Sequence, residues 1–245
     1  MLARIYPPPS AICYLPSAIR HQPSAICYMP FAIRHKPLGD SAINIQFGDQ
    51  IDLDINRRVH ALADLIQRES LNGIIECVPT YCALLVHYDP LQLTYQEVAH
   101  WLNIQSPISN LQSLNTYRLI EIPTSYDGED LEFVAQHNHL SIEDVIHIHC
   151  ETEYRVYMMG FTPGFAYMGK LDSRIVTPRL DSPRKLVKAG SVGIAGEQTG
   201  IYPIDSPGGW RLIGRTDVKL FDLDRDPPFL FAPNDRVRFV GVGKW

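Results

Sequence analysis

The chain has 245 residues, of which 45% are hydrophobic and 20% charged, so it can bury a core and is not of the disordered class. With roughly 150 residues to a domain, this length predicts one large or two modest domains. The formal charge of −5 argues against a basic nucleic-acid surface, and no apolar run approaches the ~20 residues of a membrane span. No secretory signal opens the chain, and the five cysteines lack metal-ligand spacing, which together favour reduced thiols in a cytoplasmic protein.

The first 37 residues differ in composition from the rest of the chain. They hold seven of the 19 prolines and a seven-residue unit that occurs four times, for example as Pro9–Leu15 and Pro23–Met29. A proline every seven residues excludes a coiled coil, and the unit is too short for a solenoid repeat. We expect residues 1–36 to be a disordered or artefactual extension, translated from tandem-repeat DNA or from an upstream start codon, rather than a proline-rich partner motif.

Setting this segment aside changes the charge balance. The first 37 residues contain four basic and no acidic residues, so the remaining 208 carry 18 basic and 27 acidic side chains. The part of the chain expected to fold therefore has a formal charge of −9 and three of the five cysteines.

Residues 37–113 have the pattern of a small α+β domain. Apolar side chains alternate over 41–47, and an apolar helical face follows Asp52, a residue type that caps helices. Thr94 and Glu97 have the spacing of a capping box. In chain order, the pattern predicts a strand over 41–47, a helix from Asp52 to Asn72, strands over 73–78 and 81–88, a helix from Thr94 through Trp101, and a linker over 104–114.

Residues 114–245 have the pattern of a β-rich domain. Residues 160–216 hold ten of the 16 glycines and five prolines, so short strands joined by tight turns are expected there, as in a barrel or sandwich. The remaining elements predicted are a strand over 117–122, helices over 131–137 and from Ser141 with Asp144 in its cap, a strand over 154–159 and a last strand over 235–242.

Several common site motifs are absent or incomplete. Gly164 and Gly169-Lys170 nearly match a nucleotide-binding loop, but Leu171 replaces the hydroxyl residue that binds Mg²⁺. The glycine spacing at 190–196 is not that of a dinucleotide site. The histidine pairs at 137/139 and 147/149 would point apart on a helix, so no metal site is predicted. The sequence predicts no self-sufficient catalytic centre and leaves the catalytic residues unknown.

Polar side chains within 160–216 are better candidates for a site. Arg179 and Arg184 each follow a proline, and guanidinium groups suit a carboxylate or a phosphate. The alternative interpretation is solvated arginines and turn-forming hydroxyls. The candidate substrate- or phosphate-binding residues are Arg179, Arg184, Gln198, Thr199, Tyr202, Ser206 and Arg215. The candidate backbone turns at the site are Gly164, Gly193, Gly196, Gly208 and Gly209.

The stretch from Gly160 to Thr216 closely resembles the family of 5-oxoprolinase B subunits, also called allophanate hydrolase subunit 1 or Kip-type kinase inhibitor. The resemblance covers about 37–245 and stops before the repeat; Lys188 stands where the family more often has proline. The matching motifs are Gly-Phe-x-Pro-Gly-Phe-x-Tyr at 160–167, Thr-Pro-Arg at 177–179, Pro-Arg at 183–184, the glycine-rich runs at 189–203 and 206–216, and the N-terminal signatures at 37–42 and 55–59.

This resemblance implies a small two-layer α+β N-terminal domain followed by a cyclophilin-like β-barrel. It implies a subunit that, with 5-oxoprolinase subunits A and C, opens 5-oxo-L-proline to L-glutamate at the expense of ATP, with ATP and Mg²⁺ bound by the complex. Related proteins form the carboxyltransferase part of urea-handling enzymes. Two alternatives stay open: a regulatory inhibitor that binds a sensor histidine kinase, and, from fold analogy alone, a peptidyl-prolyl isomerase.

Overall fold

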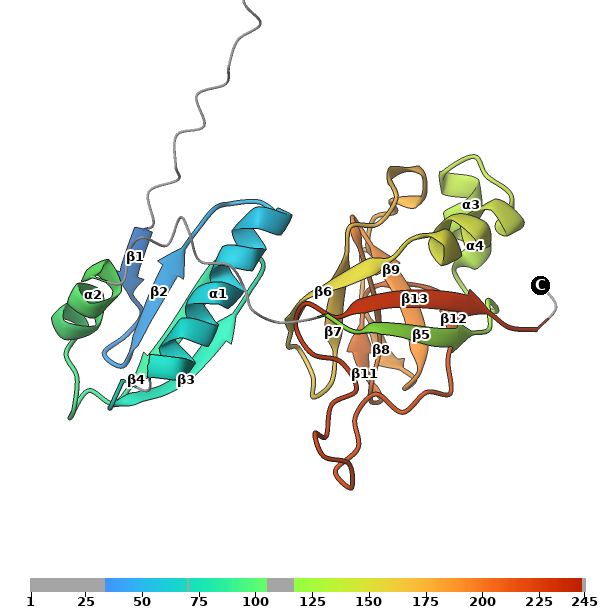
Figure 1. Ribbon diagram of the computed structural model, residues 1–245. Coiled ribbons are helices and arrows are strands. Elements are labelled where there is room, and N and C mark those ends of the chain that lie inside the picture. Colours follow the sequence, from blue (N-terminus) through green and yellow to red (C-terminus); the bar gives the residue numbers. More distant parts are fainter. Residues whose placement is uncertain (1–33, 70, 105–116, 244–245) are drawn as a thin grey trace, which may run out of the picture. The chain divides into compact units, whose positions relative to one another are not determined.

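The structure is a computed structural model that describes residues 34–69, 71–104 and 117–243 (Figure 1). Residues 31–245 form one compact unit, to which every element below belongs. The repeat up to residue 33 and all but the first residue of the linker expected over 104–114 lie outside the described residues. None of the described helices is long and apolar enough to cross a membrane.

The N-terminal domain is a four-stranded antiparallel sheet with two helices (Figure 1). The strand order is β1-β2-β4-β3, and a hydrophobic core fills the space between the sheet and the helices. Its elements are β1 (Arg34–Pro37), β2 (Ala42–Gln46), α1 (Leu53–Glu69), β3 (Ile74–Pro79), β4 (Ala83–Tyr88) and α2 (Tyr95–Ile104). From β2 onward, the predicted order of strand, helix, strand, strand, helix is confirmed, and the structure adds β1 before it.

Both helices of this domain begin at side chains that satisfy free backbone N–H groups. Asp52 accepts hydrogen bonds from the amides of Asp54 and Ile55, each at 2.9 Å. At α2, the Glu97 amide donates to the Thr94 hydroxyl at 3.3 Å and the Thr94 amide donates to the Glu97 carboxylate at 2.8 Å. The first four amides of a helix have no partner within it, so these caps fix where α1 and α2 start.

Strand β1 corrects the expected boundary of the N-terminal extension. Residues Arg34 to Pro37 pair antiparallel with β2, and the His35 ring nitrogen Nδ1 lies 3.0 Å from the Tyr95 hydroxyl of α2. The expectation that the extension runs through residue 36 is therefore wrong for residues 34–36. Backbone pairing with β2 places this strand in the sheet although its side chains show no apolar alternation.

The second domain is a nearly closed β-barrel with two helices at one end (Figure 1). The predicted helix over 131–137 and strand over 154–159 match α3 and β6 at both ends. The elements are β5 (Leu119–Thr124), α3 (Leu131–His137), α4 (Ile142–Glu151), β6 (Tyr154–Met159), β7 (Ala166–Gly169), the 3-10 helix η2 (Ser173–Ile175), β8 (Arg184–Val187), β9 (Ser191–Ala195), β10 (Gln198–Ile201), β11 (Ser206–Gly208), β12 (Arg211–Arg215) and β13 (Arg236–Gly241).

The main sheet has seven strands in the order β12-β9-β10-β7-β6-β13-β5. Only the β5–β13 pair is parallel. The chain just after β5 turns back to the other edge: Ser125 and Arg215 exchange two backbone hydrogen bonds of 2.8 Å, which brings the two edges of the sheet together. Strands β8 and β11 form a separate two-stranded ribbon. The predicted α+β class, with a small N-terminal domain followed by a barrel, is confirmed.

One fully buried histidine joins the helices to the barrel interior. His149 of α4 lies 2.7 Å from the Tyr126 hydroxyl through Nδ1 and 2.9 Å from the Thr199 hydroxyl through Nε2. The Thr199 hydroxyl also donates to the carbonyl of Gly193 at 3.0 Å. Burial lowers the pKa of His149 from its ordinary value of 6.5 to about 3, so the ring is neutral at physiological pH.

Helix α1 contacts strand β6 through two buried polar side chains. The amide nitrogen of Asn56 and the Nε2 of His60 both bond the carbonyl oxygen of Tyr157, at 3.2 and 2.8 Å. Burial lowers the pKa of His60, which keeps this ring neutral as well. The three described cysteines, at 77, 82 and 150, are free.

Candidate functional site

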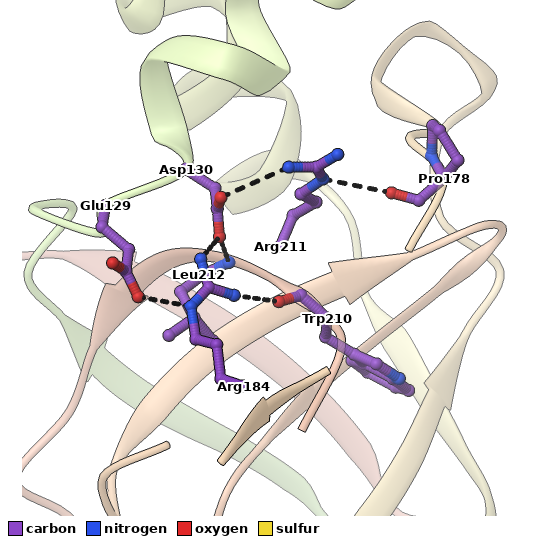
Figure 2. Close-up of polar contacts among 7 residues, drawn as sticks. All are labelled: Glu129, Asp130, Pro178, Arg184, Trp210, Arg211 and Leu212. Atoms are coloured by element: carbon purple, nitrogen blue, oxygen red, sulfur yellow. Dashed lines mark hydrogen bonds and ion pairs between the residues drawn. The ribbon is translucent and has the colours of Figure 1, made fainter. Parts of the chain in front are cut away.

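A buried ion-pair cluster organises the glycine-rich half of the barrel (Figure 2). We call Asp130, Arg184 and Arg211 the Asp130 clasp. Asp130, at the start of α3, lies 2.8 Å from Nη2 of Arg184 and 3.5 Å from Nη1 of Arg211, and it accepts the Leu212 amide at 2.7 Å. Only 8% of the Asp130 side chain is exposed, so the two guanidinium groups neutralise a carboxylate that is withdrawn from water.

The Asp130 clasp also holds the two chain segments on either side of it. Arg184 donates to the carbonyl of Trp210 at 3.1 Å, and Arg211 donates to the carbonyl of Pro178 at 3.3 Å. Figure 2 shows both arginines reaching from the carboxylate to these carbonyls. The clasp therefore fixes the backbone next to Arg179 and at Trp210, two residues of the candidate site described below.

A cluster of mostly buried aromatic side chains lies beside the clasp. Phe165 lies at the centre, with ring centroids 4.9 Å from Tyr167, 5.5 Å from Tyr202 and 5.4 Å from Trp210, all edge-to-face. Such pairs contribute roughly 0.5–1.5 kcal/mol each beyond their buried area. We call Phe165, Tyr167, Tyr202 and Trp210 the aromatic cluster, and it forms a rigid floor for the residues above it.

Arg179 lies over this floor, and its positive charge is not paired with a carboxylate of the described residues. Its guanidinium carbon is 6.0 Å from the centroid of the Trp210 ring, and its side chain is exposed. Burial raises the pKa of Tyr167, and the positive charge of Arg179 partly offsets that rise. Within the described ranges, no carboxylate is within ion-pair distance of Arg179. An exposed guanidinium over an aromatic ring is suited to bind a carboxylate or a phosphate.

Three other predicted residues lie in the same part of the barrel. Gln198, the first residue of β10, donates to the hydroxyl of Tyr81. Tyr202 belongs to the aromatic cluster and bonds the backbone of Trp210 through its hydroxyl. Ser206 in β11 has a buried hydroxyl without a hydrogen-bond partner in the described part of the chain. Gln198 is linked to Arg179 through Tyr81, on whose pKa the charge of Arg179 acts; Tyr202 belongs to the cluster beneath Arg179, and Ser206 keeps an unused hydroxyl.

The other predicted side chains have partners of their own. Arg184 is held in the Asp130 clasp and by Glu129 at 2.7 Å. Arg215 pairs with Asp127 at 3.1 Å beside the point where the barrel closes. Thr199 is fully buried and its hydroxyl serves the His149 network. We therefore leave these three residues out of the candidate site and keep Arg179, Gln198 and the aromatic cluster.

Some of the glycines predicted to form turns lie in turns, and others lie in strands or close contacts. Gly164 and Gly196 have φ of +85° and +55°, which only glycine adopts readily, and both lie in turns. Gly193 lies within β9, so the expected turn is wrong there; a side chain would come within 3.2 Å of Trp210 Cβ. Gly208 ends β11 and Gly209 follows it. A Cβ at Gly208 would lie 2.3 Å from the Tyr202 hydroxyl, so glycine is needed for close approach.

The structure also adds residues that the sequence reasoning missed. Asp130 and Glu129 precede a predicted helix, and acidic residues there usually serve the helix terminus. In the structure the Asp130 side chain makes no cap and binds Arg184 instead. The structure shows that the Asp130 carboxylate is buried and makes no capping bond. The sequence alone does not reveal either property.

The structure gives no support to the incomplete nucleotide-loop motif. Residues Ala166–Gly169 form strand β7, paired with β6, so they do not make the loop and helix start that cradle phosphates. Throughout the described ranges, no three His, Cys, Asp or Glu side chains gather as a metal site.

Known proteins are similar to this chain in sequence and fold over most of its length. Residues 33–231 match the family described as carboxyltransferase domain, subdomain C and D. The 5-oxoprolinase B subunit of Bacillus subtilis is 44% identical over 224 residues, covering 84% of this chain and 92% of that protein. The Escherichia coli O157:H7 protein of the same name is 39% identical over 210 residues, covering 83% and 93%.

A solved structure agrees with these sequence matches. The crystal structure of TTHA0988 has a TM-score of 0.75 and 39% identity, and the match covers 84% of this chain. This chain spans only 40% of that longer chain. The motifs, the barrel and the two curated relatives agree, and the chain belongs to the family of 5-oxoprolinase B subunits, whose members carry the carboxyltransferase domain.

Proposed function

We propose that this chain is the B subunit of a 5-oxoprolinase, which with subunits A and C converts 5-oxo-L-proline to L-glutamate with hydrolysis of ATP. The names of the curated relatives support the subunit role. The observation that carries the site assignment is the Arg179 surface, where an exposed guanidinium without a carboxylate partner in the described chain lies over Trp210.

The substrate's functional groups match the groups on this surface. The substrate 5-oxoproline has a carboxylate on a five-membered lactam ring. Arg179 would bind the carboxylate with two parallel N–H···O bonds, and the Gln198 side-chain amide would bond the lactam amide. Trp210 would support the flat ring from below. Because the Asp130 clasp holds the backbone on both sides, the geometry is set before the substrate arrives, which lowers the entropy lost on binding.

Coupling to ATP explains why several anionic groups must be held at once. A lactam is stable to water, so transfer of the γ-phosphoryl group to the amide oxygen would activate the ring carbon. Water then attacks that carbon and the ring C–N bond breaks, which leaves an acyl phosphate. A second water displaces phosphate from the acyl carbon, so that ATP, 5-oxoproline and two waters give ADP, phosphate and glutamate. Positive groups and backbone amides would stabilise the developing charge. We assign ATP and Mg²⁺ to the complex, since β7 occupies the near-match to a phosphate loop.

Reconstitution tests the proposal. The full chain is mixed with subunits A and C, ATP, Mg²⁺ and 5-oxoproline, and glutamate is measured with and without this chain. We expect glutamate only when all three subunits are present. Equal glutamate formation without this chain would refute the subunit role.

A matched pair of variants tests the site. Arg179→Met removes the free guanidinium, and a lost hydrogen bond to a charged group costs about 1.5–3 kcal/mol, so KM for 5-oxoproline should rise about 10- to 150-fold. Arg174→Met removes another exposed arginine that pairs with Asp172 at 2.8 Å, and should leave KM unchanged. Thermal unfolding of both variants checks the fold. An unchanged KM in Arg179→Met would remove Arg179 from the site.

A further inference from the structure

Two arginines face each other across neighbouring strands of the barrel. Arg155 of β6 and Arg236 of β13 are direct partners in the antiparallel register. Their neighbours Tyr154, Val156 and Val237 belong to the barrel core, so the two arginines lie on the opposite side of the sheet. Like charges directly opposite each other destabilise a strand pair, so this arrangement calls for a compensating group.

Other arginines nearby are neutralised in the expected way. Arg238, two residues along β13 on the same face as Arg236, lies 2.9 Å from Glu153 and 3.3 Å from Glu121. Arg118 pairs with Asp235. For Arg155 and Arg236, by contrast, no carboxylate among the described residues lies within ion-pair distance. The chain supplies counter-charges around this pair and none to the pair itself.

The same place holds three buried hydrogen-bond donors without partners. They are the Nε of Arg155, the Nε of Arg236 and the side-chain nitrogen of Asn234. Arg155 is 7% exposed and Asn234 is 3% exposed. The Asn234 oxygen accepts a bond from Arg155, which sets the orientation of the amide and leaves its nitrogen as a donor. Buried polar groups normally have partners, and an acceptor with negative charge would both satisfy the three donors and balance the two cations.

The surroundings add further positive charge. Burial lowers the pKa of Arg155, and the charges of Arg57 and Arg236 lower it further. A cavity of about 770 Å³ is lined by His60, on whose pKa Arg155 acts, and by Pro233, which precedes Asn234 in the chain; Arg155, Asn234 and Arg236 are not among its lining residues. Arg236 itself is partly exposed and lies over the Tyr117 ring at 5.3 Å.

We propose that Arg155, Arg236 and Asn234 bind a small oxyanion, either a carboxylate or a phosphate. The site differs from the Arg179 surface and does not depend on the proposed function, because its binding is measured on this chain alone. Two guanidinium groups and an amide nitrogen can donate to the oxygens of either anion. Hydrogen bonds from charged donors are stronger than hydrogen bonds from neutral donors, so the two arginines would hold the anion firmly.

Thermal unfolding of the full chain with different sodium salts tests the site. Phosphate, L-glutamate and 5-oxoproline are compared with chloride at equal ionic strength, and the concentration dependence of Tm gives an apparent Kd for each. We expect at least one oxyanion to raise Tm beyond chloride. A rise in Tm with phosphate alone would identify the ligand as a phosphate. A rise in Tm with glutamate and 5-oxoproline alone would identify it as a carboxylate.

Two variants on one strand face separate this site from general charge screening. Arg236→Gln should weaken oxyanion binding at least tenfold, whereas Arg238→Gln, which removes an arginine with two carboxylate partners, should leave it unchanged. If Arg236→Gln fails to fold, the Nε–H resonances of Arg155 and Arg236 in the ¹⁵N-labelled wild-type chain still report the site, and both should shift on titration. An equal response to chloride and oxyanions, an equal loss in both variants, or unshifted arginine resonances would overturn the proposal.

Discussion

Replacing His149 with phenylalanine should reduce the loss in the free energy of unfolding that this protein undergoes when the pH is lowered. The His149 ring is fully buried among aromatic side chains, with centroids 4.4 Å from Phe239 and 5.1 Å from Tyr154. Phenylalanine preserves these ring contacts and removes the titrating nitrogens. The bonds to Tyr126 and Thr199 are lost at every pH, so the difference between two pH values isolates the titration.

The magnitude follows from the pKa of His149, which is about 3 in the folded protein against an ordinary value of 6.5. Above pH 6.5 the ring is neutral in both states. As the pH falls from 6.5 towards 3, the unfolded chain binds a proton that the folded protein rejects, so the free energy of unfolding decreases. At about 1.4 kcal/mol per pH unit, the loss between pH 7 and pH 5 is about 2 kcal/mol.

Urea unfolding at pH 7, 6 and 5, followed by tryptophan fluorescence, measures this loss. The wild-type chain should lose about 2 kcal/mol more than His149→Phe between pH 7 and pH 5. His147→Gln is the matched control, because His147 lies on the same helix with 67% of its side chain exposed and pairs with Glu151 at the surface. The lowered pKa of His60 acts in all three proteins and cancels in the comparison. Equal losses in wild type and His149→Phe would refute the assigned burial.

Two further stability predictions test the framework of the candidate site. Asp130→Asn should lower the free energy of unfolding by about 3–5 kcal/mol in urea titrations, because it leaves the half-buried Arg211 without a carboxylate partner and Arg184 with only the exposed Glu129; Asp127→Asn, at an exposed pair, should change it by less than about 1 kcal/mol. Gly208→Ala should lower Tm because its Cβ would lie 2.3 Å from the Tyr202 hydroxyl, and Tyr202→Phe in the same chain should restore part of the loss. A wild-type Tm in Gly208→Ala would show that the contact with Tyr202 is not tight.

Local signals in the sequence predicted the helices well. At α4, Ser141 and Asp144 form the expected capping box, with the Asp144 amide 3.0 Å from the Ser141 hydroxyl. Helix caps are predictable because both partners lie within four residues. Strand β1 was missed because its place in the sheet depends on pairing with β2, and its sequence Arg-His-Lys-Pro shows no alternation.

The candidate site was only partly predictable for the same reason. The proline neighbour and the residue type of Arg179 make it a candidate from sequence, but the Asp130 clasp joins residues that are 54 and 81 positions apart. No local pattern separates Arg179, which stays free, from Arg184, which is bound. Arg155 did carry a signal, since an arginine inside the apolar strand Tyr154–Met159 needs a reason to be there.

The position of β13 has a consequence for how the protein is made. This strand comes last in chain order, yet it lies inside the sheet between β6 and β5. During synthesis both neighbours must wait with an unpaired edge until residues 236–241 emerge, and such edges are templates for pairing with other chains. A chain whose translation terminates shortly before residue 236 would be released with two unpaired strand edges. Translation of residues 236–241 is thus the step that makes it possible for β5 and β6 to be joined in one sheet.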